Sequence, residues 1–438
     1  NYKGAGFELK RKDLISSLSE STEGYIWHKV DGDKRKWFRP SDVAVGTDGA
    51  IYIADWYDPL VGGHRMLDTI GNGRIYRISP KNKKLKSPDI NLNTTKGQIE
   101  ALSSPTVNVR YMGYKHLKNQ GEVVVGDVET LLSATNPYHQ ARAVWLLSEL
   151  GDKGVKIVEN ILKNEPNPRL RVTAFRALKR NNAKLLEYAK IAVDDPSPAV
   201  RREVAISLNG VSWEDSKTII HKLFNQYQGD DRWYTEALGM ALEGKEFDAY
   251  QYFSEFEDNN PVLWSNKFAS LVWRMHPKEA INSLKERALS SKLSDSLRLL
   301  SVDAIAFISD KDAVETMIEI EQTTPKNTVS ALAKYWINYR KNNDWFSLFN
   351  WETYEKKDGN TLSVEISNLK KILLSESKPF NEKLNAAKKM TKSSEGGRVL
   401  ISLASDKNIS EEMIAAVSED LFIAFQAKLS KKQAEFRD

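Results

Sequence analysis

The sequence of 438 residues contains no cysteine. This absence excludes disulfide bonds, thiolate metal sites, a cysteine nucleophile and the covalent attachment of c-type haem within these residues. No apolar run approaches the roughly 20 residues that a membrane-spanning helix needs. Histidine is scarce, and the six histidines are scattered without the spacing of a metal site. The sequence therefore supports neither thiol chemistry nor a histidine-based metal centre.

Motifs of the common nucleotide-binding and hydrolytic enzymes are also lacking. There is no Gly-rich phosphate loop, no Gly-x-Ser-x-Gly elbow and no His-Glu-x-x-His helix, and GluGlyGlyArg at 395–398 has only a superficial likeness to a phosphate turn. The net charge of +5, from 64 basic and 59 acidic residues, is too balanced to indicate a nucleic-acid partner. A hydrophobic content of 41% is that of an ordinary globular protein with room for two or three domains.

Residues 38–79 carry a pattern of short β-strands. Apolar and polar residues alternate at 41–45 and at 50–54, and GlyThrAspGly at 46–49 is typical of the tight turn of a hairpin. A third strand is expected at 74–78, where the sequence reads ArgIleTyrArgIle. Together these segments predict a small antiparallel sheet.

Three or four such strands make one blade of a β-propeller, and a single blade cannot bury both of its faces. We therefore interpret residues 1–80 as the incomplete C-terminal end of a propeller, with strands of the preceding blade within 1–37, for example at 6–10 and 25–30. Further blades would lie before Asn1. Because the chain starts there with neither a Met nor a signal peptide, we expect a mature or excised piece of a longer protein.

The strands lie in the segments TrpPheArgProSerAspValAlaVal and AlaIleTyrIleAlaAspTrpTyrAspPro, which are followed by GlyGlyHis and GlyArgIleTyrArgIle. This region closely resembles the end of the propeller in a bacterial family of membrane-bound dehydrogenases, related to sorbosone and soluble glucose dehydrogenases. In that family a propeller is followed by HEAT-like repeats and a c-type haem domain. The resemblance covers about residues 1–80 strongly and the remainder by architecture alone. The family's CysXxxXxxCysHis motif is absent and would be expected after Asp438.

The resemblance implies an oxidoreductase that acts on a sugar or a related alcohol or aldehyde. It implies a periplasmic or cell-surface location, with membrane association through a lipid anchor outside this sequence. It also implies haem c in a part beyond Asp438, and calcium or a quinone cofactor in the propeller. We expect no cofactor within this chain, and we expect these residues alone not to be a competent enzyme.

The long connection between the second and third strands is the candidate catalytic region. In a propeller blade it lies at the same rim as the loop that enters the first strand, which puts residues 39–42 beside the 55–73 loop. A loop of this length is more often functional or disordered than neutral. Carboxylates suit a hard cation such as calcium, and a histidine can act as a base; the candidates are Asp55 and Asp58 for the metal, and His64 and Arg65 for catalysis. In the alternative interpretation the aspartates only cap turns.

Residues 81–96 are polar, basic and punctuated by proline, and we expect a linker there. From residue 97 a Pro-x-x-Arg-type signature recurs, with spacings of 32, 29 and 30 residues between Arg110, Arg142, Arg171 and Arg201. This period is typical of a solenoid of helix pairs. Apolar residues after each arginine should face the core, as at Leu117, Phe175 and Leu208. The second repeat departs from the pattern, because Glu149 stands where the others have leucine.

The fold is thus predicted to be mainly α: a HEAT-like α-solenoid over 97–340, preceded by the C-terminal blade portion of a β-propeller. We expect each signature arginine to bond acids or carbonyls of a neighbouring repeat. An aromatic-rich break follows at 341–360, and further helices are expected over 361–438. The break contains four candidates for a partner-binding patch, which could instead pack onto the solenoid: Trp345, Phe346, Phe349 and Trp351.

A solenoid presents an extended surface for binding. The first functional hypothesis is therefore a protein-interaction scaffold, with other proteins or other domains of the same chain as partners. The alternative is the oxidoreductase that the resemblance implies.

Overall fold

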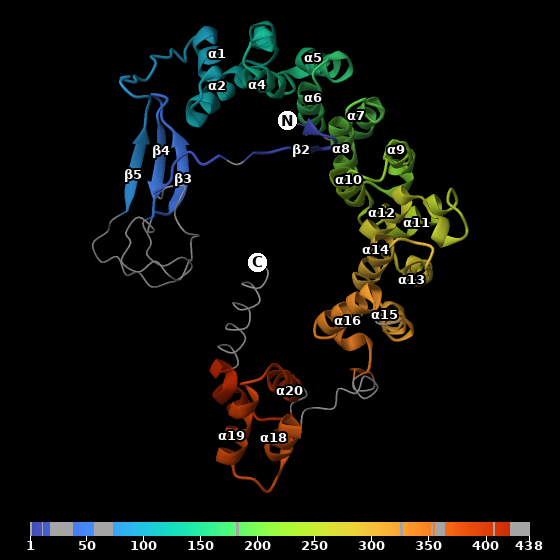
Figure 1. Ribbon diagram of the computed structural model, residues 1–438. Helices are drawn as coiled ribbons and strands as arrows, with labels where there is room; N and C mark the ends of the chain where they lie inside the picture. The colour runs from blue at the N-terminus through green and yellow to red at the C-terminus, as the bar shows by residue number, and fades with distance from the viewer. Residues whose placement is uncertain are drawn as a thin grey trace. The chain divides into compact units, whose positions relative to one another are not determined.

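A computed structural model of the chain describes residues 2–10, 12–17, 38–56, 73–180, 184–324, 327–351, 354, 364–405 and 408–420. The chain divides into two compact units, Asn1–Ile337 and Asn338–Asp438. Most described residues are helical, as predicted, and a small sheet precedes the helices (Figure 1). Within the described ranges, no helix is long and apolar enough to cross a membrane.

The sheet of the first unit has three antiparallel strands in the order β3, β4, β5. They span Pro40–Val45, Ile51–Asp55 and Arg74–Ile78, which confirms the three predicted strands. The turn between β3 and β4 needs Gly49, whose φ of 82° lies in the left-handed region. The apolar side chains of Val43 and Ile75 are exposed, as expected of a sheet with too few strands to bury both faces. The assignment of this sheet to a propeller stays a prediction.

Residues 2–7 form a separate hairpin of two short strands, β1 (Tyr2–Lys3) and β2 (Gly6–Phe7). We expected residues 6–10 to form a strand of a preceding blade. The structure instead places Ala5 and Phe7 in contact with helices of the solenoid. The other strand expected before the sheet, at 25–30, lies outside the described residues.

Irregular chain runs from the sheet to the first helix, where we expect the linker. Thr106, at the start of the second helix, ties the helices to the sheet by donating its hydroxyl to the Gly46 carbonyl at 2.8 Å. The helices of the first unit are α1 (Thr95–Ser103), α2 (Val107–Gln120), α3 (Val125–Glu129), α4 (Pro137–Leu147), α5 (Gly151–Asn164), α6 (Pro168–Lys179), α7 (Leu185–Ala192), α8 (Pro198–Ser207), α9 (Trp213–Asn225), α10 (Arg232–Leu242), α11 (Glu246–Ser254), α12 (Asn266–Met275), α13 (Ile281–Leu289), α14 (Asp295–Ala306), α15 (Lys311–Thr323) and α16 (Thr328–Arg340).

Helices that are next but one in sequence lie side by side, so the chain builds a solenoid-like stack (Figure 1). We call α4, α6, α8, α10, α12 and α14 the first row; each of them contacts the next. The intervening helices α5, α7, α9 and α11 form the second row in the same way. Leu117, Phe175 and Leu208 are fully buried, as predicted from their place after the signature arginines.

The signature residues shape the turns before the first-row helices. Proline occupies the start of α4, α6 and α8, where its missing N–H costs no hydrogen bond. Arg110, Arg171 and Arg201 each donate a guanidinium hydrogen bond to a main-chain carbonyl five or six residues upstream. Arg142 donates instead to the Leu102 carbonyl of the preceding repeat, at 3.0 Å. The predicted bond to an acid or carbonyl of a neighbouring repeat is confirmed for Arg142 and for Arg171, which also pairs with Asp195. It is wrong for Arg110 and Arg201, whose carbonyl acceptors lie in the turn before their own helix.

The described helices of the second unit are α18 (Val364–Leu374), α19 (Phe380–Met390), α20 (Ser394–Ser405) and residues 411–420. Their shared core includes Leu369, Met390, Leu400 and Met413. The GluGlyGlyArg segment at 395–398 is helical, so it is not a phosphate turn. A Cβ on Gly396 would lie 2.3 Å from the Met390 carbonyl oxygen, and the glycine therefore permits close packing after α19.

Candidate functional site

The predicted rim lies where β3 begins and β4 ends. Pro40 pairs with Asp55, and the Trp56 N–H donates to the Arg39 carbonyl at 2.9 Å. The buried Asp55 carboxylate accepts a hydrogen bond from the Arg39 N–H at 2.8 Å. The predicted proximity of the 39–42 segment to the start of the long loop is therefore confirmed. This bond gives Asp55 a structural role of the kind foreseen in the turn-capping alternative.

The remaining candidates of this rim, Asp58, His64 and Arg65, lie outside the described residues. Among the residues that the structure describes, no group of three or more His, Cys, Asp or Glu side chains could hold a metal ion. Because the sequence has no cysteine, it cannot attach c-type haem covalently. The catalytic interpretation of the rim stays a prediction.

The aromatic break does not present its four candidates as one patch. Trp345 is fully buried, whereas Phe346 is 57% exposed. Trp351 donates its indole N–H to the Phe346 carbonyl at 3.2 Å and packs against the Phe349 ring, with 5.2 Å between centroids. Trp345 is thus buried, Phe349 and Trp351 pack against each other, and Phe346 is the one of the four that solvent reaches best.

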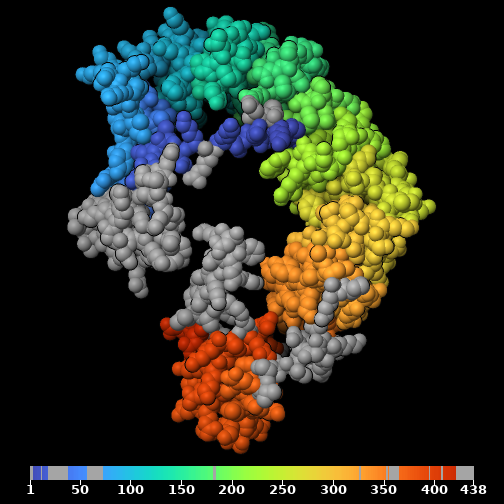
Figure 2. Space-filling model, in the orientation of Figure 1, coloured from blue at the N-terminus to red at the C-terminus, as the bar shows by residue number. Residues whose placement is uncertain are grey.

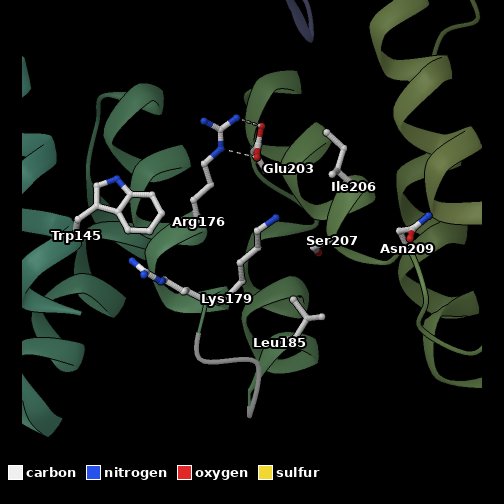
Figure 3. A pocket seen from close by; sticks show the side chains of 9 residues that line it. Trp145, Arg176, Lys179, Leu185, Glu203, Ile206, Ser207 and Asn209 are labelled. Carbon is white, nitrogen blue, oxygen red and sulfur yellow. Dashed lines mark hydrogen bonds and ion pairs between the residues drawn. The ribbon is translucent and has the colours of Figure 1, made fainter. Parts of the chain in front are cut away.

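A groove of about 700 Å³ opens on the first row, over α4, α6 and α8 (Figure 3). Trp145 and Ile206 supply apolar surface at its two sides, and Arg176 and Lys179 project into the space between them. The remaining lining residues are Arg180, Leu185, Glu203, Ser207 and Asn209. Three cations and one carboxylate line the groove, which leaves an excess of two positive charges.

Glu203 is the buried acid of this groove. Its carboxylate accepts two bonds from Arg176, at 2.7 and 2.8 Å, and two from Arg202, at 2.7 and 3.2 Å. Burial raises the pKa of Glu203, but the hydrogen bonds from Arg176 and Arg202 outweigh it and hold the pKa below its ordinary value. The carboxylate is therefore ionised at neutral pH and fixes both guanidinium groups.

Replacing Glu203 by glutamine should remove part of the acid sensitivity of the protein. A carboxyl whose pKa is lower in the folded than in the unfolded state stabilises the fold above the unfolded pKa, and this contribution is lost as the pH falls through the folded pKa. We expect Glu203→Gln to lower the free energy of unfolding by about 1–3 kcal/mol at pH 7, because a neutral amide bonds two guanidinium groups poorly. Urea unfolding between about pH 7 and pH 3 should show that the free energies of unfolding of the two proteins converge as the pH falls. A difference in stability that does not change with pH would contradict the lowered pKa of Glu203.

Glu149, which stands where the other repeats have leucine, holds a cation at one end of the groove. Its carboxylate pairs with Arg180 at 3.1 Å and also with Lys118. Burial raises the pKa of the Tyr114 hydroxyl, and its hydrogen bond to Glu149 adds to the shift. Leu150, one position later, is fully buried and takes the core place. The glutamate thus joins cations of α2 and α6 across one repeat.

Sequence reasoning did not find the groove, although a periodic signal was available. Trp145, Arg176 and Ile206 are separated by 31 and 30 residues, the period of the signature arginines. Surface positions of the same phase in successive repeats line the same strip of a solenoid. Glu203 gave no such signal, because its partners come from two helices.

Comparison with known proteins adds little to this geometry. No protein-family model and no curated protein matches the chain. Among solved structures, the chain is similar to that of YibA from Escherichia coli, with 16% sequence identity over 56% of this chain and 92% of that chain. The TM-score is 0.33, and at this value the similarity carries no argument.

Proposed function

We propose that the solenoid is a protein-interaction scaffold whose groove binds a short acidic segment of a partner protein. The observation that carries the proposal is the groove itself: an open volume of about 700 Å³ with an excess of cations and a tryptophan at one side. Carboxylates of a partner would meet Lys179 and Arg180, and an apolar side chain would meet Trp145 or Ile206.

The charges favour an acidic partner for a specific reason. Arg176 already forms a bidentate pair with Glu203, so a ligand gains little from it. Within the described part of the chain, no carboxylate pairs with Lys179, and Arg180 keeps 63% of its side chain exposed beside Glu149. Complementary charge at a rim accelerates association and selects among partners more than it strengthens binding.

The shape of the groove favours a peptide over a compact ligand. Its lining comes from helices of successive repeats, and a solenoid surface of this kind suits an extended chain. Tryptophan and arginine are also the residues that contribute most at protein interfaces.

Replacing Lys179 by glutamate should weaken the binding of an acidic peptide by about tenfold, which corresponds to about 1.4 kcal/mol. The probe is a fluorescein-labelled peptide of alternating glutamate and leucine, and fluorescence anisotropy measures its affinity. The matched control is Lys190→Glu, which makes the same charge change at an exposed position of α7 in the second row. Added salt should weaken binding to the wild-type protein.

Equal weakening in the two variants would show only a dependence on net charge and would contradict binding in the groove. Absence of binding by the wild-type protein at millimolar peptide would contradict the acidic ligand.

A further inference from the structure

The N-terminal hairpin lies against helices α8 and α10 of the first row. Both views show it there: β2 runs beside α8 in Figure 1, and the dark-blue residues contact the green helices in Figure 2. Ala5, between the two strands, is fully buried. A segment that is 226 residues away from its partner Asp231 is therefore held on the surface of the first row.

Two buried or partly buried charges bind both main-chain groups of Ala5. The Ala5 N–H donates to Asp231 Oδ2 at 2.7 Å, and the Ala5 carbonyl accepts a bond from Arg202 Nη1. Asp231 Oδ1 also caps α10 by accepting the Tyr234 N–H at 3.1 Å. Arg202 is in turn fixed by Glu203 at 2.7 Å. Both contacting side chains are thus held in place by the solenoid, and neither depends on the side chain of Ala5.

The residues on either side of Ala5 must be small. A Cβ on Gly6 would lie 2.0 Å from Trp233 Cδ1, and a Cβ on Gly4 would lie 2.2 Å from Asp231 Oδ2. Gly4 also has a φ of 57°, which favours glycine. The next residue, Phe7, places its ring under the Arg202 guanidinium, with 5.3 Å from Cζ to the centroid. Because Ala5 is fully buried, the contacts select glycine, a small residue, glycine and an aromatic residue in that order.

We propose that Arg202, Asp231 and Trp233 form a peptide-binding site that is selective for a hairpin turn of sequence Gly-small-Gly-aromatic, and that Gly4–Phe7 of this chain is its occupant. Recognition combines hydrogen bonds to the main chain with exclusion of side chains at two positions, and the cation–π contact selects the aromatic residue. The site is distinct from the acidic-peptide groove, and the inference holds whatever the groove binds.

The first test is hydrogen exchange of the full chain, read by mass spectrometry on the fragment that contains Ala5. We expect the Ala5 amide of the Gly6→Val variant to exchange at least tenfold faster than in the wild-type protein. Valine suits a strand, so only the contact with Trp233 opposes it. The control is Gly126→Val in α3, where a Cβ would meet nothing within 4 Å. Unchanged exchange of Ala5 in Gly6→Val would overturn the proposal.

The second test supplies the segment from outside. A fluorescein-labelled peptide of residues 2–9, TyrLysGlyAlaGlyPheGluLeu, should bind the Gly6→Val chain at least tenfold more tightly than the wild-type chain, whose site is filled. The same peptide carrying Gly6→Val should not bind. Because this peptide has one basic and one acidic side chain, its binding does not report on the acidic-peptide groove. Equal affinity of the two chains, or of the two peptides, would overturn the proposal.

Discussion

Replacing Asp195 by alanine should lower the free energy of unfolding by about 3–5 kcal/mol, the usual result of removing one partner of a buried ion pair. Asp195 and Arg171 are both buried and share two hydrogen bonds, of 2.7 and 2.8 Å. The carboxylate also accepts the Ser197 N–H at 2.8 Å, at the start of α8. The variant leaves a buried guanidinium without its carboxylate and a helix start without an acceptor. Urea unfolding followed by circular dichroism measures the loss.

The neighbouring residue provides a matched control. Asp194 pairs with Lys222 at 2.6 Å, but their side chains are 60% and 48% exposed. An exposed pair contributes about 0–1 kcal/mol, so Asp194→Ala should change the free energy of unfolding little. Similar losses in the two variants would mean that the turn before α8 responds to any substitution, and would contradict a specific role for the buried pair.

The sequence predicted one partner of this ion pair and not the other. Arg171 belongs to a repeat signature, whose spacing can be read from the chain. Its contact with Asp195 is set by the way α6, α7 and α8 fold back on one another, 24 residues further along. Local patterns specify a helix turn and its capping residues, whereas the partner of a side chain depends on packing.

The same distinction explains the β-structure. The strands of the sheet were predicted correctly because adjacent segments and an Asp-Gly turn form them. The N-terminal hairpin was expected in a propeller, since strand pattern alone does not show what a strand contacts. Its hydrogen bond to Asp231 spans 226 residues, and nothing local marks it. The selectivity of that site for glycine emerges only when Trp233 is in place.

The groove and the aromatic break illustrate a further limit. Trp345 and Phe346 are adjacent and equally apolar, yet one is buried and the other largely exposed. Outside a regular helix or strand there is no period that assigns a face to each residue. The groove has such a period, at Trp145, Arg176 and Ile206, and was therefore predictable in principle.

The second large loss of stability is expected on substitution of Arg287. This residue lies in the part of the solenoid where the Pro-x-x-Arg-type signature is no longer recognisable. It is 1% exposed, donates to the Pro261 carbonyl at 2.5 Å and lies over the Trp264 ring, 5.5 Å from its centroid. Burial lowers the pKa of this guanidinium, and the charge of Glu257 partly offsets the shift. The arginine thus links α13 to the turn before α12, much as the signature arginines link helices earlier in the chain.

Replacing Arg287 by alanine should lower the free energy of unfolding by about 3–5 kcal/mol, because it leaves a buried carbonyl without its donor and a cavity beside Trp264. Arg287→Lys keeps the charge but loses the planar group that stacks on the ring, so an intermediate loss is expected. Lys285→Ala, on the same helix, removes a more exposed pair with Glu319 and should cost about 1 kcal/mol or less. Urea unfolding of the three variants distinguishes these outcomes. If the lysine variant were as stable as the wild-type protein, charge alone would account for the site, and the stacked guanidinium would have no separate role.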